Sequence, residues 1–318
     1  MNTKPLLFSA LSIAASVSSG MACASPFVTS GLATSALETA RAVRESADAH
    51  MTQAVVDTTR ADGGAIWLDL KALYDKADGL GKNAGFDNDT AVANLGADIR
   101  YGESFFGVVY TYAKADTESR GSSVKADGEA DMFGITAFGQ RNFGGLNLAL
   151  SAGWLYVSGD SDMNGTRAET NANLWSFDAA ARYGFNFGNL DFVPYAKIEY
   201  TLFRPRHHGD WSLDNANLWQ FPIGVNAAYT IVFADGSKLR PQIDLAVIRT
   251  AGDTEFAAYD GSGVRVDETI TGSHTLYRGL VGLAWTSGKG TLRAGYRYLG
   301  SEQGRDSHCY ELKADYTF

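Results

Sequence analysis

The stretch Trp219-Gln-Phe-Pro-Ile-Gly-Val-Asn-Ala-Ala-Tyr-Thr-Ile-Val-Phe233 decides the fold class. Every second residue from Trp219 to Phe233 is apolar, which gives eight apolar positions without a break. The positions between them include Gln220, Asn226 and Thr230. A period of two predicts a β-strand with one apolar and one polar face. An apolar face of this length has to meet lipid or a very large core.

The same alternation continues from Gly64 to the last residue and predicts an all-β protein. No run of about 18 apolar residues follows residue 24, so the sequence predicts no membrane-spanning helix. The mean hydropathy of −0.15 suits a barrel with a polar lumen, because only every second strand residue meets lipid. Twelve segments are predicted strands, at 64–76, 89–101, 104–116, 129–142, 145–158, 171–186, 190–204, 216–233, 238–250, 273–286, 290–300 and 307–318.

The connections between these segments alternate strictly between short and long. Short turns are expected at Gly102-Glu103, Phe143-Gly144, Phe187 to Asn189, Asp235-Gly236 and Gly288 to Gly290. Longer polar loops are expected at 77–88, 117–128, 159–170, 205–215, 251–272 and 301–306. Bacterial outer-membrane barrels have short periplasmic turns and longer outer loops. The sequence therefore predicts a twelve-stranded antiparallel transmembrane β-barrel over residues 63–318.

The last strand, Tyr310 to Phe318, carries an expected assembly signal. Tyr316 and Phe318 fall on its apolar face and end the chain on an aromatic residue, although Lys313 stands where such signals often have Gly. This ending resembles the signal by which the barrel assembly machinery recognises outer-membrane proteins. The partners expected are outer-membrane lipid, the barrel assembly machinery and periplasmic chaperones, with the barrel itself a monomer.

Residues 1–24 form a predicted signal peptide. Lys4 is followed by an apolar run, and the segment ends on Ala22-Cys23-Ala24, an A-x-A cleavage site. Export to the cell outer membrane is expected to follow. Removing Lys4 changes the formal charge from 27 − 36 = −9 to 26 − 36 = −10, which disfavours nucleic acid as a partner. Cys309 then has no cysteine to pair with.

An Ala-rich helix is predicted from Ser35 to Arg60, within a short N-terminal unit at 25–62. Ser35 and Glu38 have the spacing of a capping box, which places the predicted start of the helix at Ser35. Ion pairs are expected at i,i+4 between Arg41 and Glu45, and likewise between Arg44 and Asp48. The apolar stripe is too thin for an ordinary core but suits a narrow polar tunnel, so the helix is expected to thread the pore.

The inner face of the strands is charged with both signs. Such charges either pair with one another and with the helix, or hydrate an open pore. The residues expected to line the lumen are Asp69, Asp98, Arg100, Asp178, Arg182, Glu199, Arg240, Asp244, Arg278, Arg293, Arg297 and Glu311.

These features together resemble the translocator domain of monomeric autotransporters over residues 35–318. The resemblance implies a twelve-stranded barrel, with the helix in its pore, that translocates or anchors an N-terminal passenger at the cell surface. Its points are the helix leading into Gly64-Ala-Ile-Trp67, the segment Asp87-Asn-Asp-Thr90 before Leu95-Gly-Ala-Asp98, the run Arg293-Ala-Gly-Tyr-Arg-Tyr298, and Tyr316-Thr-Phe318.

Three alternatives stay open at this stage. Only residues 25–34 separate the signal from the predicted helix, so a passenger is expected to be vestigial. The loops, 251–272 above all, could instead serve as an adhesin, or the chain could be a diffusion porin. Catalysis or metal binding at His207, His208 and Asp210, or catalysis at Asp160 and Asp162, would need a geometry that a sequence does not reveal. We expect no enzyme activity and no cofactor.

Overall fold

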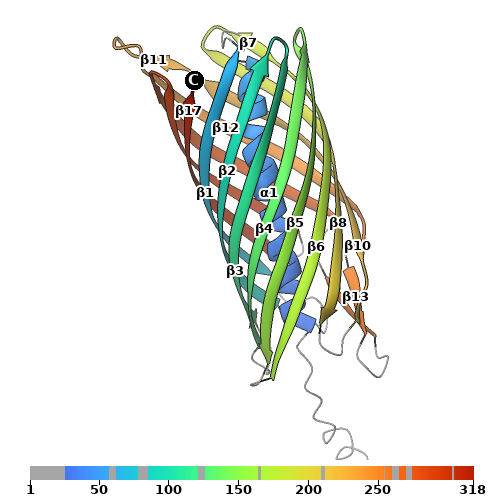
Figure 1. Cartoon of the computed structure of the whole chain (residues 1–318). Coiled ribbons are helices and arrows are strands. Elements are labelled where there is room, and N and C mark those ends of the chain that lie inside the picture. The colour runs from blue at the N-terminus through green and yellow to red at the C-terminus, as the bar shows by residue number, and fades with distance from the viewer. Residues whose placement is uncertain are drawn as a thin grey trace, which may run out of the picture.

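The computed structural model is a closed β-barrel with a helix inside it (Figure 1). It describes residues 26–56, 62–77, 85–120, 126–163, 166–208, 212–253, 255–259, 265–269, 274–302 and 304–318, so the predicted signal peptide lies outside the described part. The helix is α1 (Pro26–Val56). The barrel strands are β1 (Gly63–Ala77), β2 (Gly85–Tyr101), β3 (Ser104–Arg120), β4 (Ala126–Phe143), β5 (Leu146–Met163), β6 (Thr166–Tyr183), β8 (Leu190–His208), β10 (Ala216–Tyr229), β12 (Lys238–Gly252), β15 (Thr275–Ser287), β16 (Gly290–Ser301) and β17 (Arg305–Thr317).

The barrel closes where β1 pairs with β17. Two short strands continue longer ones: β7 (Phe185–Phe187) follows β6 and pairs with β8, and β11 (Ile231–Val232) follows β10 and pairs with β12. Each therefore shares the neighbour of the strand that it extends. Every pairing is antiparallel, and the twelve-stranded barrel expected from the alternation is confirmed.

The two faces of each strand separate apolar from polar side chains. In β1, Ile66, Leu68 and Leu70 are exposed on the outside, whereas Trp67 and Asp69 are buried inside. Aromatic residues gather outside near the short turns and again toward the other end, as in the two interfacial girdles of membrane barrels. The first group comprises Tyr101, Phe143, Phe185, Phe187, Phe233, Trp285 and Phe318, and the second Tyr74, Tyr112, Trp175, Trp219, Tyr277 and Tyr310.

The short turns lie as expected, whereas most predicted outer loops are wrong in extent. Each short turn contains a glycine with positive φ, such as Gly102 at 55° and Gly236 at 81°. The strands instead run far into the predicted loops: β5 ends at Met163 and β6 begins at Thr166. Their 18 residues exceed the roughly 9–11 that cross a membrane. The outer ends of these strands extend beyond the apolar band, and there both faces are polar. Without alternation, such segments cannot be told from loops in the sequence.

Two of the outer connections also form strands that the alternation did not predict. The small strand β9 (Ser212–Leu213) pairs with β13 (Glu255–Tyr259), which pairs with β14 (Arg265–Thr269). These strands form a separate three-stranded sheet beyond the barrel wall. The predicted loop at 251–272 therefore contains a β-hairpin.

The predicted start of the helix at Ser35 is also wrong, because α1 begins at Pro26. Ser35 and Glu38 lie inside the helix, and Glu38 faces arginines of the barrel wall, so its carboxylate is not a cap. At about 1.5 Å per residue, the 31 residues of α1 extend about 46 Å, more than the apolar thickness of a bilayer. No described helix is long and apolar enough to cross a membrane.

A glycine on β2 makes room for the indole of β1. Gly96 lies opposite Trp67, and a Cβ added at Gly96 would collide with the indole ring. Trp67 is 2% exposed, so its ring has little space into which to retreat. Overpacking of this kind costs about 1–3 kcal/mol.

We therefore expect Gly96→Ala to lower the urea midpoint of unfolding. The midpoint is measured from the loss of the compact, fast-migrating form of the barrel in cold gel electrophoresis. Gly279→Ala is the matched control, because its added Cβ would meet only Leu245 at an ordinary 3.8 Å. Equal midpoints for the two variants would contradict this packing.

Candidate functional site in the helix-filled lumen

The outer half of α1 rests on an apolar lining of the barrel. Leu32, Ala36, Leu37 and Ala40 are buried against inner side chains of the wall. The helix lies closest to β2–β5, where its small residues allow a close approach. The wall residues of this cluster are Leu73, Val92, Ala113, Ala115, Ala130, Met132, Leu155, Val157, Ala172, Leu174, Phe203, Ala216, Leu218 and Cys309.

The other half of α1 has a second apolar contact nearer the short turns. Val43, Ala47 and Met51 pack with Trp67, Phe105, Val109, Phe138 and Ala149. The two clusters hold the helix along its length on one side of the lumen.

Charged residues of the same helix bind the wall. Glu38 is fully buried, and its carboxylate accepts hydrogen bonds from Arg305 at 2.8 Å and from Arg297 at 3.3 Å. Arg41 also contacts Glu38 and donates to Gln220 at 3.1 Å. A buried charge is tolerated only when it is paired and hydrogen-bonded. Glu38 meets this requirement through three arginines.

Glu45, Arg44 and Asp48 repeat this arrangement toward the short turns. Glu45 lies 3.2 Å from Arg278 and 3.4 Å from Arg297. Arg44 lies 3.5 Å from Asp178 and 3.6 Å from Glu199, and Asp48 pairs with Arg182 and Lys197. The expected i,i+4 pairs, Arg41 with Glu45 and Arg44 with Asp48, are therefore wrong. Arg44, Glu45 and Asp48 pair with the wall instead, because charged side chains of the wall surround this side of the helix.

All twelve residues expected to line the lumen lie on the inner side of the wall. Eight contact helix side chains, namely Asp69, Asp98, Asp178, Arg182, Glu199, Arg278, Arg293 and Arg297. The other four have wall partners: Arg100 donates to the carbonyl oxygen of Gly102, Arg240 pairs with Asp191, Asp244 with Arg278, and Glu311 with Lys71.

Further charges lie on the inner face besides the twelve expected lumen residues. Lys71, Lys313 and Asp315 follow from the alternation of the first and last strands, whereas Asp191 and Lys197 of β8 were not expected. Arg305 was assigned to the loop at 301–306, although it begins β17 and binds Glu38. The period of two along each strand already places all of these charges on the inner face.

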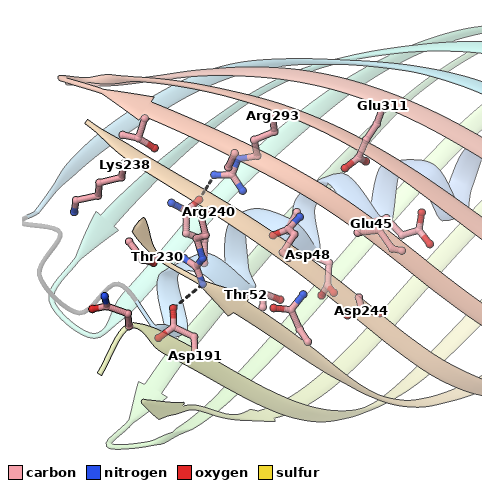
Figure 2. Close-up of a pocket in the computed structure, with 18 of the residues that line it drawn as sticks. Glu45, Asp48, Thr52, Asp191, Thr230, Lys238, Arg240, Asp244, Arg293 and Glu311 are labelled. Atoms are coloured by element: carbon pink, nitrogen blue, oxygen red, sulfur yellow. Dashed lines mark hydrogen bonds and ion pairs between the residues drawn. The ribbon is translucent and has the colours of Figure 1, made fainter. Parts of the chain in front are cut away.

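A polar cavity of about 430 Å³ lies beside α1, on the side away from β2–β5 (Figure 2). It extends toward the turn at Gly188 and Asn189. Arg240 and Asp191 pair at 2.8 Å across this cavity, and Glu45 and Asp48 face it from the helix. Because residues of both charges line it, the cavity is more typical of a water-filled space than of a binding site for one ligand.

The residues considered for catalysis or metal binding do not assemble a centre in the described part of the chain. Asp162 is exposed on β5, directly across from Asp127. Asp210 and the side chains of His207 and His208 lie outside the described residues. Among the described residues, no group of three or more His, Cys, Asp or Glu has the geometry of a metal site.

The residues expected as an assembly signal lie at the closing strand. Tyr316 and Phe318 point outward and are 51% and 63% exposed. The amide of Phe318 donates to the carbonyl oxygen of Gly64 at 2.9 Å, so the end of the chain is tied to β1. Their role in assembly stays a prediction.

A closed twelve-stranded barrel whose pore holds the preceding helix defines an autotransporter-type outer-membrane barrel. The autotransporter β-domain family matches residues 66–298 by sequence, and the chain belongs to this family. A search among curated proteins gives no match.

Solved structures of translocator domains have the same fold. The transport unit of the autotransporter AIDA-I from Escherichia coli superposes with a TM-score of 0.65 at 15% identity, covering 85% of this chain and 97% of that one. The β domain of the Bordetella autotransporter BrkA gives 0.63 at 14%, covering 81% and 100%. The translocator domain of NalP from Neisseria meningitidis gives 0.60 at 14%, covering 88% and 98%.

The Glu38 network predicts a large effect of one substitution. Glu38→Ala leaves the guanidinium groups of Arg41, Arg297 and Arg305 buried without their shared carboxylate, a loss of about 3–5 kcal/mol. We expect a clear fall in the urea midpoint. Glu129→Ala, which removes an exposed pair with Lys114, should change the midpoint little. A Glu38→Ala protein as stable as the parent would show that the network does not hold the helix.

Proposed function

We propose that this barrel anchors at the cell surface, and delivers there, the segment that precedes α1, while α1 stays in the pore. The direction of the helix carries the proposal. Its first half packs with Phe203, Ala216 and Leu218 near the outer loops, and its second half with Phe105 and Phe138 near the short turns. The first residue of α1, Pro26, therefore lies at the loop end, which is the outer side of such barrels (Figure 1).

The contacts between α1 and the lumen wall support a pore filled by the helix over an open pore. The two apolar clusters and the wall ion pairs hold α1 along its length. The cavity beside α1 is lined by residues that extend from Glu45 toward the short turns, whereas the outer half of the helix rests on apolar side chains. A diffusion porin would need a continuous aqueous path.

We include export across the inner membrane and assembly into the outer membrane in the same proposal. The predicted signal peptide would direct export, and periplasmic chaperones and the barrel assembly machinery would act on Tyr316, Phe318 and the strands. We propose no catalytic role for the lumen, since its buried carboxylates such as Glu38 bind arginines. The vestigial passenger stays a prediction. Residues 26–34, which that prediction included, belong to α1.

A surface tag and a conductance measurement test the proposal together. An epitope inserted between Ser25 and Pro26 should be labelled by antibody on intact cells, because it precedes the helix at the loop end. The purified barrel should conduct little in planar bilayers, and deletion of residues 26–56 should raise its conductance.

The opposite outcome of these two measurements would contradict the proposal. A tag that is labelled only after the outer membrane is permeabilised, together with high conductance of the intact protein, would support a porin. A second epitope, placed in the outer connection between β12 and β15, controls for the presence of the barrel at the surface.

A further inference from the structure

The seam between β1 and β17 is where the first and last strands close the barrel. Lys71 and Glu311 face each other across this seam and form an ion pair at 3.2 Å. Asp69 lies opposite Lys313, and Trp67 lies opposite Asp315 in the same register. These inner residues of the seam are positioned to meet the helix.

Ser46 of α1 contacts both sides of the seam. Its hydroxyl contacts the carboxylate of Asp69 on β1 and accepts a hydrogen bond from Asn94 on β2 at 3.2 Å. Its backbone carbonyl oxygen accepts a hydrogen bond from Nζ of Lys313 on β17 at 3.1 Å. One helix residue therefore bonds to the first two strands and the last strand at once.

His50, one helical turn farther on, does the same. Its Nε2 lies 2.9 Å from Oδ1 of Asp315 on β17, and its Nδ1 lies 3.5 Å from Oδ2 of Asp98 on β2. The imidazole stacks on the indole of Trp67 on β1, with ring centroids 4.6 Å apart. Nζ of Lys313 lies 4.1 Å from the centre of that indole. His50 is 4% exposed, so these contacts exclude most water.

We propose that Ser46 and His50 form a seam clamp, which makes closure of β1 onto β17 depend on a docked helix. A group that contacts both strands stabilises the closed seam and not the open one, so its binding shifts the equilibrium toward closure. The polypeptide that fills the pore then also completes the wall. On this proposal the seam does not close before the helix has docked.

Asp48 provides a helix contact of the same kind away from the seam. It pairs with Arg182 on β6 and Lys197 on β8, on another part of the wall. Alanine has the highest helix propensity, so substitution to Ala at positions 46, 48 and 50 does not weaken the helix itself. Asp48→Ala therefore removes a helix-to-wall contact and leaves both sides of the seam untouched.

Cys309 makes closure measurable. It lies directly opposite Leu73 across the seam, and both side chains are buried in the lumen. Directly opposed residues of antiparallel strands are about 4.5–5.5 Å apart at Cα, within the range for a disulfide. Leu73→Cys in a Cys23→Ser background should form a disulfide with Cys309 only when the seam is closed in register.

The experiment follows this disulfide while the full-length chain refolds from urea into detergent micelles, with copper phenanthroline as the oxidant. The Ser46→Ala, His50→Ala double variant should form it about tenfold more slowly than the parent, because it loses the bond of the Ser46 hydroxyl to Asp69 and the contacts of the His50 ring with β1, β2 and β17. The bond from Lys313 to the Ser46 carbonyl oxygen stays in this variant. Asp48→Ala, which removes two helix-to-wall ion pairs away from the seam, should slow it less than the double variant does. If the double variant does not refold, His50→Ala alone, which removes side-chain contacts with β17, β2 and β1, should still be slower than Asp48→Ala.

Two outcomes would overturn the seam clamp. Equal slowing by Asp48→Ala and by the double variant would mean that the helix supports the wall generally. An unchanged rate in the double variant would mean that the seam closes through its own pairs, such as Lys71 and Glu311. The readout does not depend on what the barrel carries, so it is separate from the surface-tag test of function.

Discussion

The constraint on which this structure depends is the pairing of charges in a lumen shared with a helix. Strands of a membrane barrel turn apolar side chains outward, so polar and charged side chains collect inside. A narrow lumen with little water leaves such charges costly unless they are paired. The helix α1 supplies partners for both signs: Glu38, Glu45 and Asp48 meet arginines and a lysine, and Arg44 meets carboxylates.

The composition of the helix follows from the same constraint. A helix with large side chains all round would not fit beside the inner face of β2–β5, and a helix without charges would leave the opposite wall unpaired. The apolar side of α1 is therefore mostly alanine, with Leu32, Leu37, Val43 and Met51 filling wider places. The space left over lies as a polar cavity on the far side of the helix. Helix and wall act as one packed unit.

Much of this fold was predictable from the sequence, because the strand period of two is visible in segments such as 219–233. The inner positions were predictable for the same reason. The outer halves of the strands were not, because beyond the lipid both faces are polar and alternation disappears, as at 159–163. The helix start was missed because Ser35 and Glu38 imitate a capping box. The partners of Arg44 and Asp48 depend on which wall residues surround the helix, which no local spacing encodes.

Hydrogen–deuterium exchange of the folded barrel in detergent tests the central claim, that α1 is a bonded part of the lumen, most directly. The account predicts that amides from Leu32 to Met51 exchange as slowly as those in the middle of β2–β5, because packing against the wall prevents local opening. Exchange of these amides at the rate of a solvent-exposed helix, with the strands still protected, would contradict it.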